Sequence, residues 1–451
     1  MNRLEEYEAL QRELEQPAEK LEGTLQRAKR RRNRENHLIR PFVSAAAVFF
    51  LFVLLVNVSS TVAYACAQVP VLRELARVVK FSNSLTTAVE NEYVQPINLV
   101  QKQGEISGKV EYLIVDQKQV NVFYRLYSDK YEELTADPRI YDADGKNPQP
   151  CSYHSDAFNK KNGELQSVTI DFWNSDVPEA LKLQLVVRDT AVDLREESWV
   201  PVEDAYFMEQ EPETDYLAKL EFLLEFDPTY TAEGRKISVN ETVELDGQKI
   251  TVTEVEIYPT QLRINVIEEE GNTAELQDFY FYLLTESGKK FDPVTEGVTA
   301  AQFEDVISYV ADSTWFYEEK SIQLVITGAE WLDHDKKKVY VNLETCEAEG
   351  LPEGIELYSA EEKEGGWIVK IQAEKRAANH FHQIMERTYY DVEGTEYFID
   401  SWSSMILEEE TENESFAEEF ALKDYHGTEV YLCPHYSRQW TAPEPITLVI
   451  R

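Results

Sequence analysis

Apolar and polar residues alternate with a period of two over most of the chain after about residue 91, which is typical of half-buried β-strands. One alternating run places Val110, Tyr112 and Ile114 on one face. Similar runs occupy residues 120–126, 250–252 and 262–266. Helical periodicity is rare in this part. The pattern therefore predicts a mainly β fold of tandem antiparallel β-sandwich (Ig-like) domains.

Three similar segments recur in the same order and indicate an internal repeat. Turn-like segments with a glycine occupy 141–146, 284–289 and 390–395, and apolar strands follow at 183–187, 322–326 and 446–450. Strands 219–224 and 338–343 resemble each other as domain openings. The repeat predicts three β domains at 91–190, 215–328 and 336–451. An acidic link with Pro201 and Pro212 would join the first two.

The N-terminal part differs, because no charged residue occurs between Arg40 and Arg73. Residues 41–67 are long enough to cross the roughly 30 Å apolar layer of a membrane as one helix. A dense positive run precedes them and predicts a cytoplasmic N-terminus and extracytoplasmic C-terminal domains in the cell membrane. The residues of this topology signal are Arg27, Lys29, Arg30, Arg31, Arg32, Arg34 and Arg40.

Two alternatives to a retained anchor remain open. The sequence Ala63-Tyr64-Ala65 resembles a signal-peptide cleavage site, and cleavage after Ala65 would release the β domains. About 40 residues precede the apolar stretch, whereas a signal peptide carries a short basic segment there, so retention is favoured. Lipidation at Cys66 is less favoured because Ala63 stands where a leucine is expected.

Short helical patterns flank the apolar stretch. In the cytoplasmic segment 1–40, an apolar stripe with helical spacing predicts a partner-binding helix, or else a solvated helix. This stripe consists of Leu4, Tyr7, Leu10, Leu14, Leu21 and Leu25. In segment 68–90, residues 69–81 predict an amphipathic helix at the outer membrane face or docked on the first domain. Residues 82–87 are predicted to form a polar link.

The composition limits the function. The 451-residue chain has a net charge of −40, so we expect no binding to nucleic acid. The four cysteines are too few for a disulfide scaffold, although Cys346 and Cys433 would be able to pair within one domain. No nucleotide-binding or catalytic motif is present, and we expect a non-enzymatic protein without a cofactor.

Three further patterns give only weak chemical signals. His380 and His382 have the same spacing as Cys433 and His435, and together they would suit zinc or copper, but ordinary histidines are favoured. Residues 142–147 resemble part of a calcium loop, yet a plain hairpin turn is favoured. A sugar-binding tryptophan surface is less favoured than core positions. These tryptophans are Trp173, Trp315, Trp331, Trp367, Trp402 and Trp440.

The segment around the apolar stretch resembles a known bacterial family. The resemblance rests on Asn57-Val58-Ser59, on Val69-Pro70-Val71-Leu72, on Val78-Val79-Lys80-Phe81, on 90–96 and on 115–120. These motifs are similar to single-pass membrane proteins with the domain of unknown function 4179, over roughly residues 1–130. The resemblance implies an all-β ectodomain and an anti-sigma-like role toward an extracytoplasmic-function sigma factor of Gram-positive bacteria.

Together these observations predict a signalling regulator that links an unidentified external ligand to a cytoplasmic partner. The alternative is a structural, adhesive or cell-wall-binding surface protein without a cytoplasmic partner.

Overall fold

The computed structural model describes residues 74–156, 160–189, 216–294, 299–317, 321–374, 383–407 and 415–450. The chain divides into two compact units, 1–73 and 74–451, and the described residues all belong to the second. Nearly all of its strands pair antiparallel, which confirms the mainly β prediction. The predictions for residues 1–67 lie outside the described part. Within the described ranges, no helix has the length and apolarity that a membrane crossing requires.

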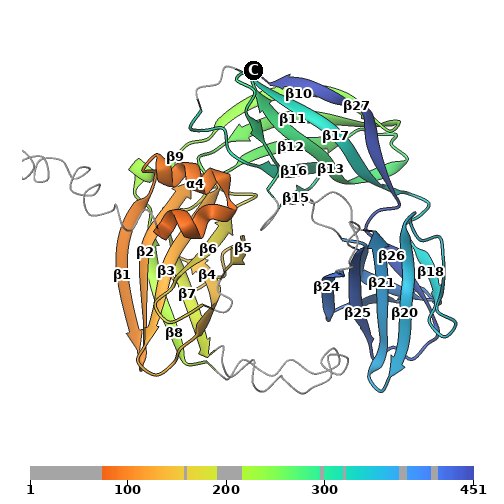
Figure 1. The fold of residues 1–451 in the computed structure, drawn as a ribbon, viewed down its shortest axis with the longest axis horizontal. Helices are drawn as coiled ribbons and strands as arrows, with labels where there is room; N and C mark the ends of the chain where they lie inside the picture. The colour runs from red at the N-terminus through yellow and green to blue at the C-terminus, as the bar shows by residue number, and fades with distance from the viewer. Residues whose placement is uncertain are drawn as a thin grey trace, which may run out of the picture. The chain divides into compact units, whose positions relative to one another are not determined.

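The first core lies between two sheets (Figure 1). One sheet has the order β1-β2-β3-β6-β5, and the other β4-β7-β8. Side chains from both sheets, such as Val122 and Leu185, share one buried cluster. The strands are β1 Gln95–Gln103, β2 Ile106–Asp116, β3 Gln119–Ser128, β4 Leu134–Asp142, β5 Ser152–Ser155, β6 Leu165–Asp171, β7 Ala180–Asp189 and β8 Ala218–Glu225. The short strand β9 (Thr231–Ala232) pairs parallel with β2.

The second core repeats this arrangement. Its sheets have the orders β10-β11-β12-β16-β15 and β14-β13-β17-β27, around a cluster that contains Ile264 and Leu324. The strands are β10 Arg235–Leu245, β11 Gln248–Ile257, β12 Leu262–Glu268, β13 Ala274–Thr285, β14 Lys290–Phe291, β15 Ala300–Phe303, β16 Val306–Ala311, β17 Ile322–Asp333 and β27 Arg438–Ile450. In sheet position, β10 to β13 correspond to β1 to β4, β17 to β7, and β27 to β8.

The third core is formed by the chain between β17 and β27, so it is inserted into the second. Its sheets are β19-β18-β26-β22-β23 and β20-β21-β25-β24. The strands are β18 Val339–Asn342, β19 Glu347–Glu349, β20 Ile355–Lys363, β21 Gly366–Glu374, β22 Met385–Asp391, β23 Glu396–Phe398, β24 Trp402–Leu407, β25 Ser415–Lys423 and β26 Glu429–Pro434. Val341, Val369 and Leu432 belong to its buried cluster.

The three glycine turns predicted from the repeat share one geometry. The side chains of Asp142, Thr285 and Asp391 each accept a hydrogen bond from the backbone N–H four residues later, at 2.8 to 3.1 Å. The glycine three residues on has a positive φ in each turn, between 71° and 86°, which glycine adopts without a steric penalty. The resemblance to a calcium loop therefore reflects a plain hairpin turn, as favoured.

Two strand assignments from the repeat are wrong. The strand at 219–224, expected to open the second domain, is β8 and pairs with β7 of the first core. The strand at 446–450, expected to close the third domain, belongs to β27 and pairs with β17 of the second core. The chain between β7 and β8 therefore connects neighbouring strands of one sheet and does not link two domains. Pairing between distant strands, which local sequence does not reveal, decides both assignments.

A β-bulge also shifts one predicted face. Val110 lies opposite Tyr124 and Tyr112 lies opposite Phe123, so Glu111 is an extra residue in β2. Behind a bulge the alternation changes phase. The prediction is therefore right for Val110 but wrong for Tyr112 and Ile114, because Leu113 and Val115 join the core cluster instead.

The segment before the first core is helical. Residues 74–78 form helix, followed by the 3-10 helix η1 (Val79–Phe81) and helix α4 (Asn83–Glu90). Ser82 caps α4, since its side chain accepts a hydrogen bond from Leu85 N at 3.2 Å. The polar link predicted at 82–87 is therefore wrong, because Ser82 starts a helix that buries Leu85, Ala88 and Val89.

Candidate functional site

The helical segment 74–90 buries apolar residues and forms an ion pair with the first core. Leu75 and Val79 are fully buried. Glu74 forms an ion pair with Arg125 of β3, 2.7 Å from Oε2 to Nη2, and Arg125 also contacts Glu111 at 3.2 Å. Arg125 holds the pKa of Glu74 below its usual value through their hydrogen bond. Of the two predicted locations for this helix, docking on the first core is the one its described residues occupy.

Helix α4 also contacts the second core through one carboxylate. The side-chain amide of Asn83 donates to Asp312 Oδ2 at 2.7 Å, and the Ser84 hydroxyl donates to Oδ1 at 3.2 Å. Ser313 N in turn donates to the Ser84 hydroxyl at 2.7 Å. Ser84, Asp312 and Ser313 are all buried, so these polar groups stabilise the contact only while they remain paired. The segment that follows the apolar stretch is thus held by both cores.

Asp116 joins the first two cores directly. Its carboxylate is fully buried at the end of β2 and accepts from Lys118 N and Gln119 N, both at 2.9 Å. Its other oxygen accepts from the backbone and the hydroxyl of Thr260, at 2.9 and 2.6 Å. Burial raises the pKa of Asp116, and these donors oppose that shift. Nearby, Arg263 stacks 4.3 Å above the ring of Trp173.

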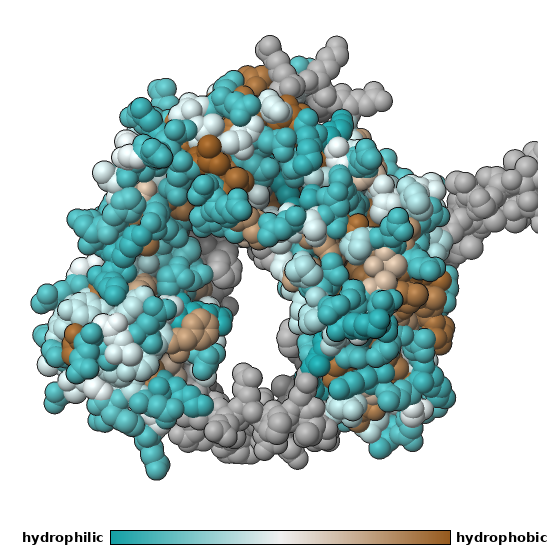
Figure 2. Space-filling model, turned by 180° about the vertical axis from the view of Figure 1, so that it is seen from behind, coloured by the Kyte–Doolittle hydropathy of each residue, from teal (hydrophilic) through white to brown (hydrophobic). Residues whose placement is uncertain are grey.

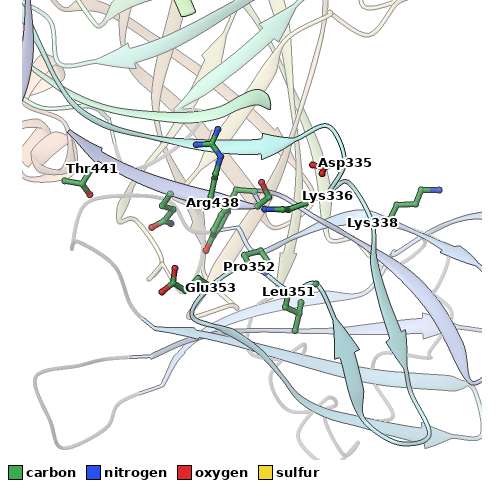
Figure 3. Close-up of a pocket in the computed structure, with 12 residues that line it drawn as sticks. Asp335, Lys336, Lys338, Leu351, Pro352, Glu353, Arg438 and Thr441 are labelled. Atoms are coloured by element: carbon green, nitrogen blue, oxygen red, sulfur yellow. The ribbon is translucent and has the colours of Figure 1, made fainter. Parts of the chain in front are cut away.

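A polar pocket of about 670 Å³ lies where the chain passes between the second and third cores. Figure 3 shows Arg438 and Lys336 on one side, with Pro352 and Glu353 opposite, while Lys338 points away. The full lining is Asp335, Lys336, Lys338, Gly350, Leu351, Pro352, Glu353, Tyr436, Ser437, Arg438, Gln439 and Thr441. This mixture of charged, hydroxyl and amide groups suits a small polar ligand.

Asp333 orders one wall of the pocket. Its carboxylate accepts from Arg438 Nε at 3.0 Å, from the Ser437 hydroxyl at 3.0 Å and from Lys336 Nζ at 3.2 Å. Arg438 also pairs with Asp246 of the second core. The charges of Arg438 and Lys336 are therefore largely neutralised by neighbouring carboxylates.

Carboxyl groups gather beside this pocket. Glu330 accepts hydrogen bonds from the hydroxyl of Tyr280 and from Gln439. Burial raises the pKa of Asp278 to about 7, with repulsion from Glu330 adding to it. His435 Nδ1 lies 2.6 Å from Glu386 Oε1, and this contact raises the pKa of the imidazole although burial opposes it. These groups bring β13, β17 and β22 into one electrostatic network.

Of the predicted metal residues, the structure describes Cys433 and His435. Both are half-buried near β26, and His435 is engaged with Glu386. His380 and His382 lie outside the described residues. Across the described ranges, no three His, Cys, Asp or Glu side chains are grouped to hold a metal. Cys151, Cys346 and Cys433 are free thiols, so the possible pairing of Cys346 with Cys433 is not formed.

The tryptophans occupy core or half-buried positions, as favoured over a sugar-binding surface. Trp331 and Trp367 are buried, and Trp402 stacks on Phe420 at 4.9 Å. Trp315 and Trp440 pack against the second core, and the indole N–H of Trp173 donates to Ser152. Figure 2 shows that the visible surface is largely hydrophilic, with hydrophobic positions in small groups.

The described residues thus form a polar pocket and two hydrogen-bonded contacts between parts of the chain. The predicted topology signal and the cytoplasmic stripe lie outside the described residues. The pocket and the Asp116 and Asp312 contacts were not predicted, because each unites residues more than 90 positions apart in the chain. Of these residues, only Asp116 at the end of β2 is visible in the local sequence, and there it resembles an ordinary turn residue.

Comparison with known proteins agrees with the resemblance. Residues 33–128 match the family described as "Domain of unknown function (DUF4179)", which confirms the predicted resemblance for this part of the chain. Residues 234–358 match the "Family of unknown function (DUF5643)". No curated protein matches. A similar solved structure, "The crystal structure of the conserved domain protein from Bacillus anthracis", is 13% identical, with a TM-score of 0.38, over 57% of this chain and 85% of that one.

Proposed function

We propose that this chain, whose residues 33–128 match the domain of unknown function 4179, is a single-pass membrane protein that transmits an external signal. In this proposal, residues 41–67 anchor it and residues 1–40 bind a cytoplasmic partner, an extracytoplasmic-function sigma factor. The β cores, each an Ig-like sandwich, lie outside and bind an external ligand without catalysing a reaction.

One observation carries the proposal. The segment that follows the apolar stretch has its apolar residues Leu75 and Val79 buried, is ion-paired to the first core through Glu74 and Arg125, and is hydrogen-bonded to the second core through Asp312. A tether with no task beyond anchoring needs no such contacts. A packed junction, in contrast, passes a displacement of the cores to the chain that precedes it. The charge-free stretch between Arg40 and Arg73 supplies the membrane element of the same proposal.

The test is co-purification of the full chain from its native membrane in mild detergent. We expect a sigma factor to be retained by the wild type and lost from a Leu10→Glu, Leu14→Glu variant, because charge on the apolar stripe removes its binding face. A Glu8→Gln variant is the control, since it changes a polar position of the same segment. Retention of no sigma factor by the wild type would contradict the regulator and leave the structural or adhesive alternative.

The topology is tested separately. A reporter that is active only outside the cell, fused after Arg451, is expected to be active, and the product should stay in the membrane fraction. Activity of a cytoplasmic reporter at the same position would exclude the proposed orientation. Release of the β part into the medium would instead support cleavage after Ala65.

A further inference from the structure

Three tyrosines form a row across the outer face of one sheet of the third core. Tyr340 of β18 lies opposite Tyr431 of β26, and Tyr431 lies opposite Tyr390 of β22. Their neighbours Val341, Val430 and Tyr389 point inward and are buried. Because side chains alternate along a strand, the three rings share the outward face. With strands about 4.8 Å apart, the row spans about 10 Å.

Neighbouring groups hold the rings in place. The Tyr340 hydroxyl donates to Glu429, and the Tyr390 hydroxyl donates to Glu396 Oε2 at 3.0 Å. The rings of Tyr340 and Tyr431 pack edge to face, with centroids 5.8 Å apart. The platform is therefore ordered before any ligand binds, which lowers the entropy cost of binding.

Hydrogen-bonding groups surround the row. Glu349 of β19 continues it beyond Tyr340, and Glu396 of β23 continues it beyond Tyr390. Lys338 Nζ lies 3.2 Å from the centre of the Tyr390 ring. Phe398, 64% exposed, extends the apolar surface on β23. Ring faces beside carboxylates and an ammonium form the combination that recognises a ligand with apolar C–H faces and equatorial hydroxyl groups.

We propose that this Tyr340–Tyr431–Tyr390 surface binds an extended, neutral glycan chain. Sugar rings stack on the tyrosines, and their hydroxyl groups donate to Glu349, Glu396 and Glu429. The carboxylates along the row repel polyanions, and the net charge of −40 adds to that repulsion, which excludes nucleic acid and acidic polysaccharides as ligands. A row of three rings on neighbouring strands matches a chain ligand better than the compact shape of a single sugar.

The proposal deepens the proposed function, because it names the class of external ligand. It rests on that function only for the location of the surface outside the cell. Glycan binding is measured on the purified chain and does not depend on a cytoplasmic partner. A failure to bind glycan and a failure to retain a sigma factor are therefore separate results.

The experiment is titration calorimetry of the full chain in a detergent without sugar groups. The probes are the hexamer of N-acetylglucosamine and cellohexaose, which are neutral and extended. Tyr431→Ala removes the central ring and is expected to weaken binding at least about tenfold, which corresponds to about 1.4 kcal/mol. Tyr431→Phe keeps the ring and is expected to retain binding. Tyr358→Ala is the matched control, because Tyr358 is an exposed tyrosine, 59% accessible, on β20 of the other sheet.

The outcomes separate the explanations. Binding by the wild type, its loss in Tyr431→Ala and its retention in Tyr358→Ala support the proposal. Absence of binding to both neutral probes overturns it, as does equal binding by Tyr431→Ala. Binding only to the cationic hexamer of glucosamine, abolished by salt, would show attraction to the acidic surface and also overturn it. If Tyr431→Ala unfolds at a lower temperature than the wild type, Tyr390→Ala takes its place with the same expected loss.

Discussion

Glu418 gives the sharpest prediction about the stability of the third core. It lies in β25, is 1% exposed, and accepts hydrogen bonds from Ile384 N at 2.9 Å and Met385 N at 3.0 Å. Burial raises its pKa from 4.5 to about 7, against the effect of these two donors and of His435, while Glu386 adds to the rise. The carboxyl therefore connects the two sheets of the core at an energetic cost when it ionises.

The sign follows from the raised pKa. The contribution of Glu418 to the free energy of unfolding is fully present below its unfolded-state pKa of 4.5. It is lost as the pH rises through its folded-state pKa of about 7. A pKa difference of about 2.5 corresponds to about 3 kcal/mol, of which about 2.5 kcal/mol is lost between about pH 5 and about pH 8. Glu418→Gln cannot ionise, so this pH-dependent loss should disappear. It also replaces one acceptor with an N–H donor, which costs about 1–3 kcal/mol at either pH.

The assay is urea unfolding of the full chain in detergent, with a short protease pulse that digests only unfolded chains. Fragments that derive from the third core are followed by mass spectrometry. At about pH 5 the variant should be less stable than the wild type by about 1–3 kcal/mol, and near pH 8 it should equal or exceed it. The control is Glu419→Gln, a half-exposed neighbour on the same strand. A difference between wild type and Glu418→Gln that does not change with pH would refute the reasoning.

Three further predictions concern the fold and its junctions. Gly366→Ala places a Cβ against the backbone carbonyl of Leu422 at a φ of 133°, and should cost at least about 3 kcal/mol in urea unfolding, whereas Gly247→Ala, with open space around it, should cost about 1 kcal/mol. Asp116→Ala should lower stability by about 2–4 kcal/mol in the same assay, because buried donors lose their acceptor; an unchanged midpoint would show that the joint is not maintained in solution. Leu75→Ala should cost about 2–5 kcal/mol and speed amide hydrogen exchange in α4, and unchanged exchange would contradict its docking.

Local features of the fold were predictable from the sequence. The glycine turns were found because a turn depends on a few consecutive residues, here Asp391 and Gly394 in the third core. The alternation at Leu262, Ile264 and Val266 was also right, since all three join the second core. These features need no information from distant parts of the chain.

Non-local features were not predictable. The extra residue Glu111 changes the phase of β2, and nothing in the alternation marks it, because Tyr112 and Ile114 continue an apolar pattern. Strand β11, which corresponds to β2 in the second core, also carries a bulge, after Val252. The bulge is therefore a feature that the two cores share. The inward and outward faces of such strands can therefore be assigned only when their pairing with neighbouring strands is known.

The candidate sites were even less predictable, because they unite residues that are far apart in the sequence. Asp116 and Thr260 are 144 residues apart, and neither has a sequence neighbourhood that marks a contact. The tyrosine row unites three strands that are separated by up to about 90 residues, and only their register places Tyr340, Tyr431 and Tyr390 side by side. The tryptophans were the more prominent candidates for sugar binding, but their greater apolar area is used in the cores.

The position of the third core gives the proposed signal a continuous route. Because it is inserted between β17 and β27, two strands connect it to the second core, and these strands pair with each other from Ile322 to Trp331. The second core in turn contacts α4 through Asp312. A glycan bound on the outer face of β18, β26 and β22 would therefore act on a core with two covalent connections instead of one flexible tether. A force on the glycan would reach the helix that precedes the first core through paired strands and buried hydrogen bonds, which deform less than a loop does.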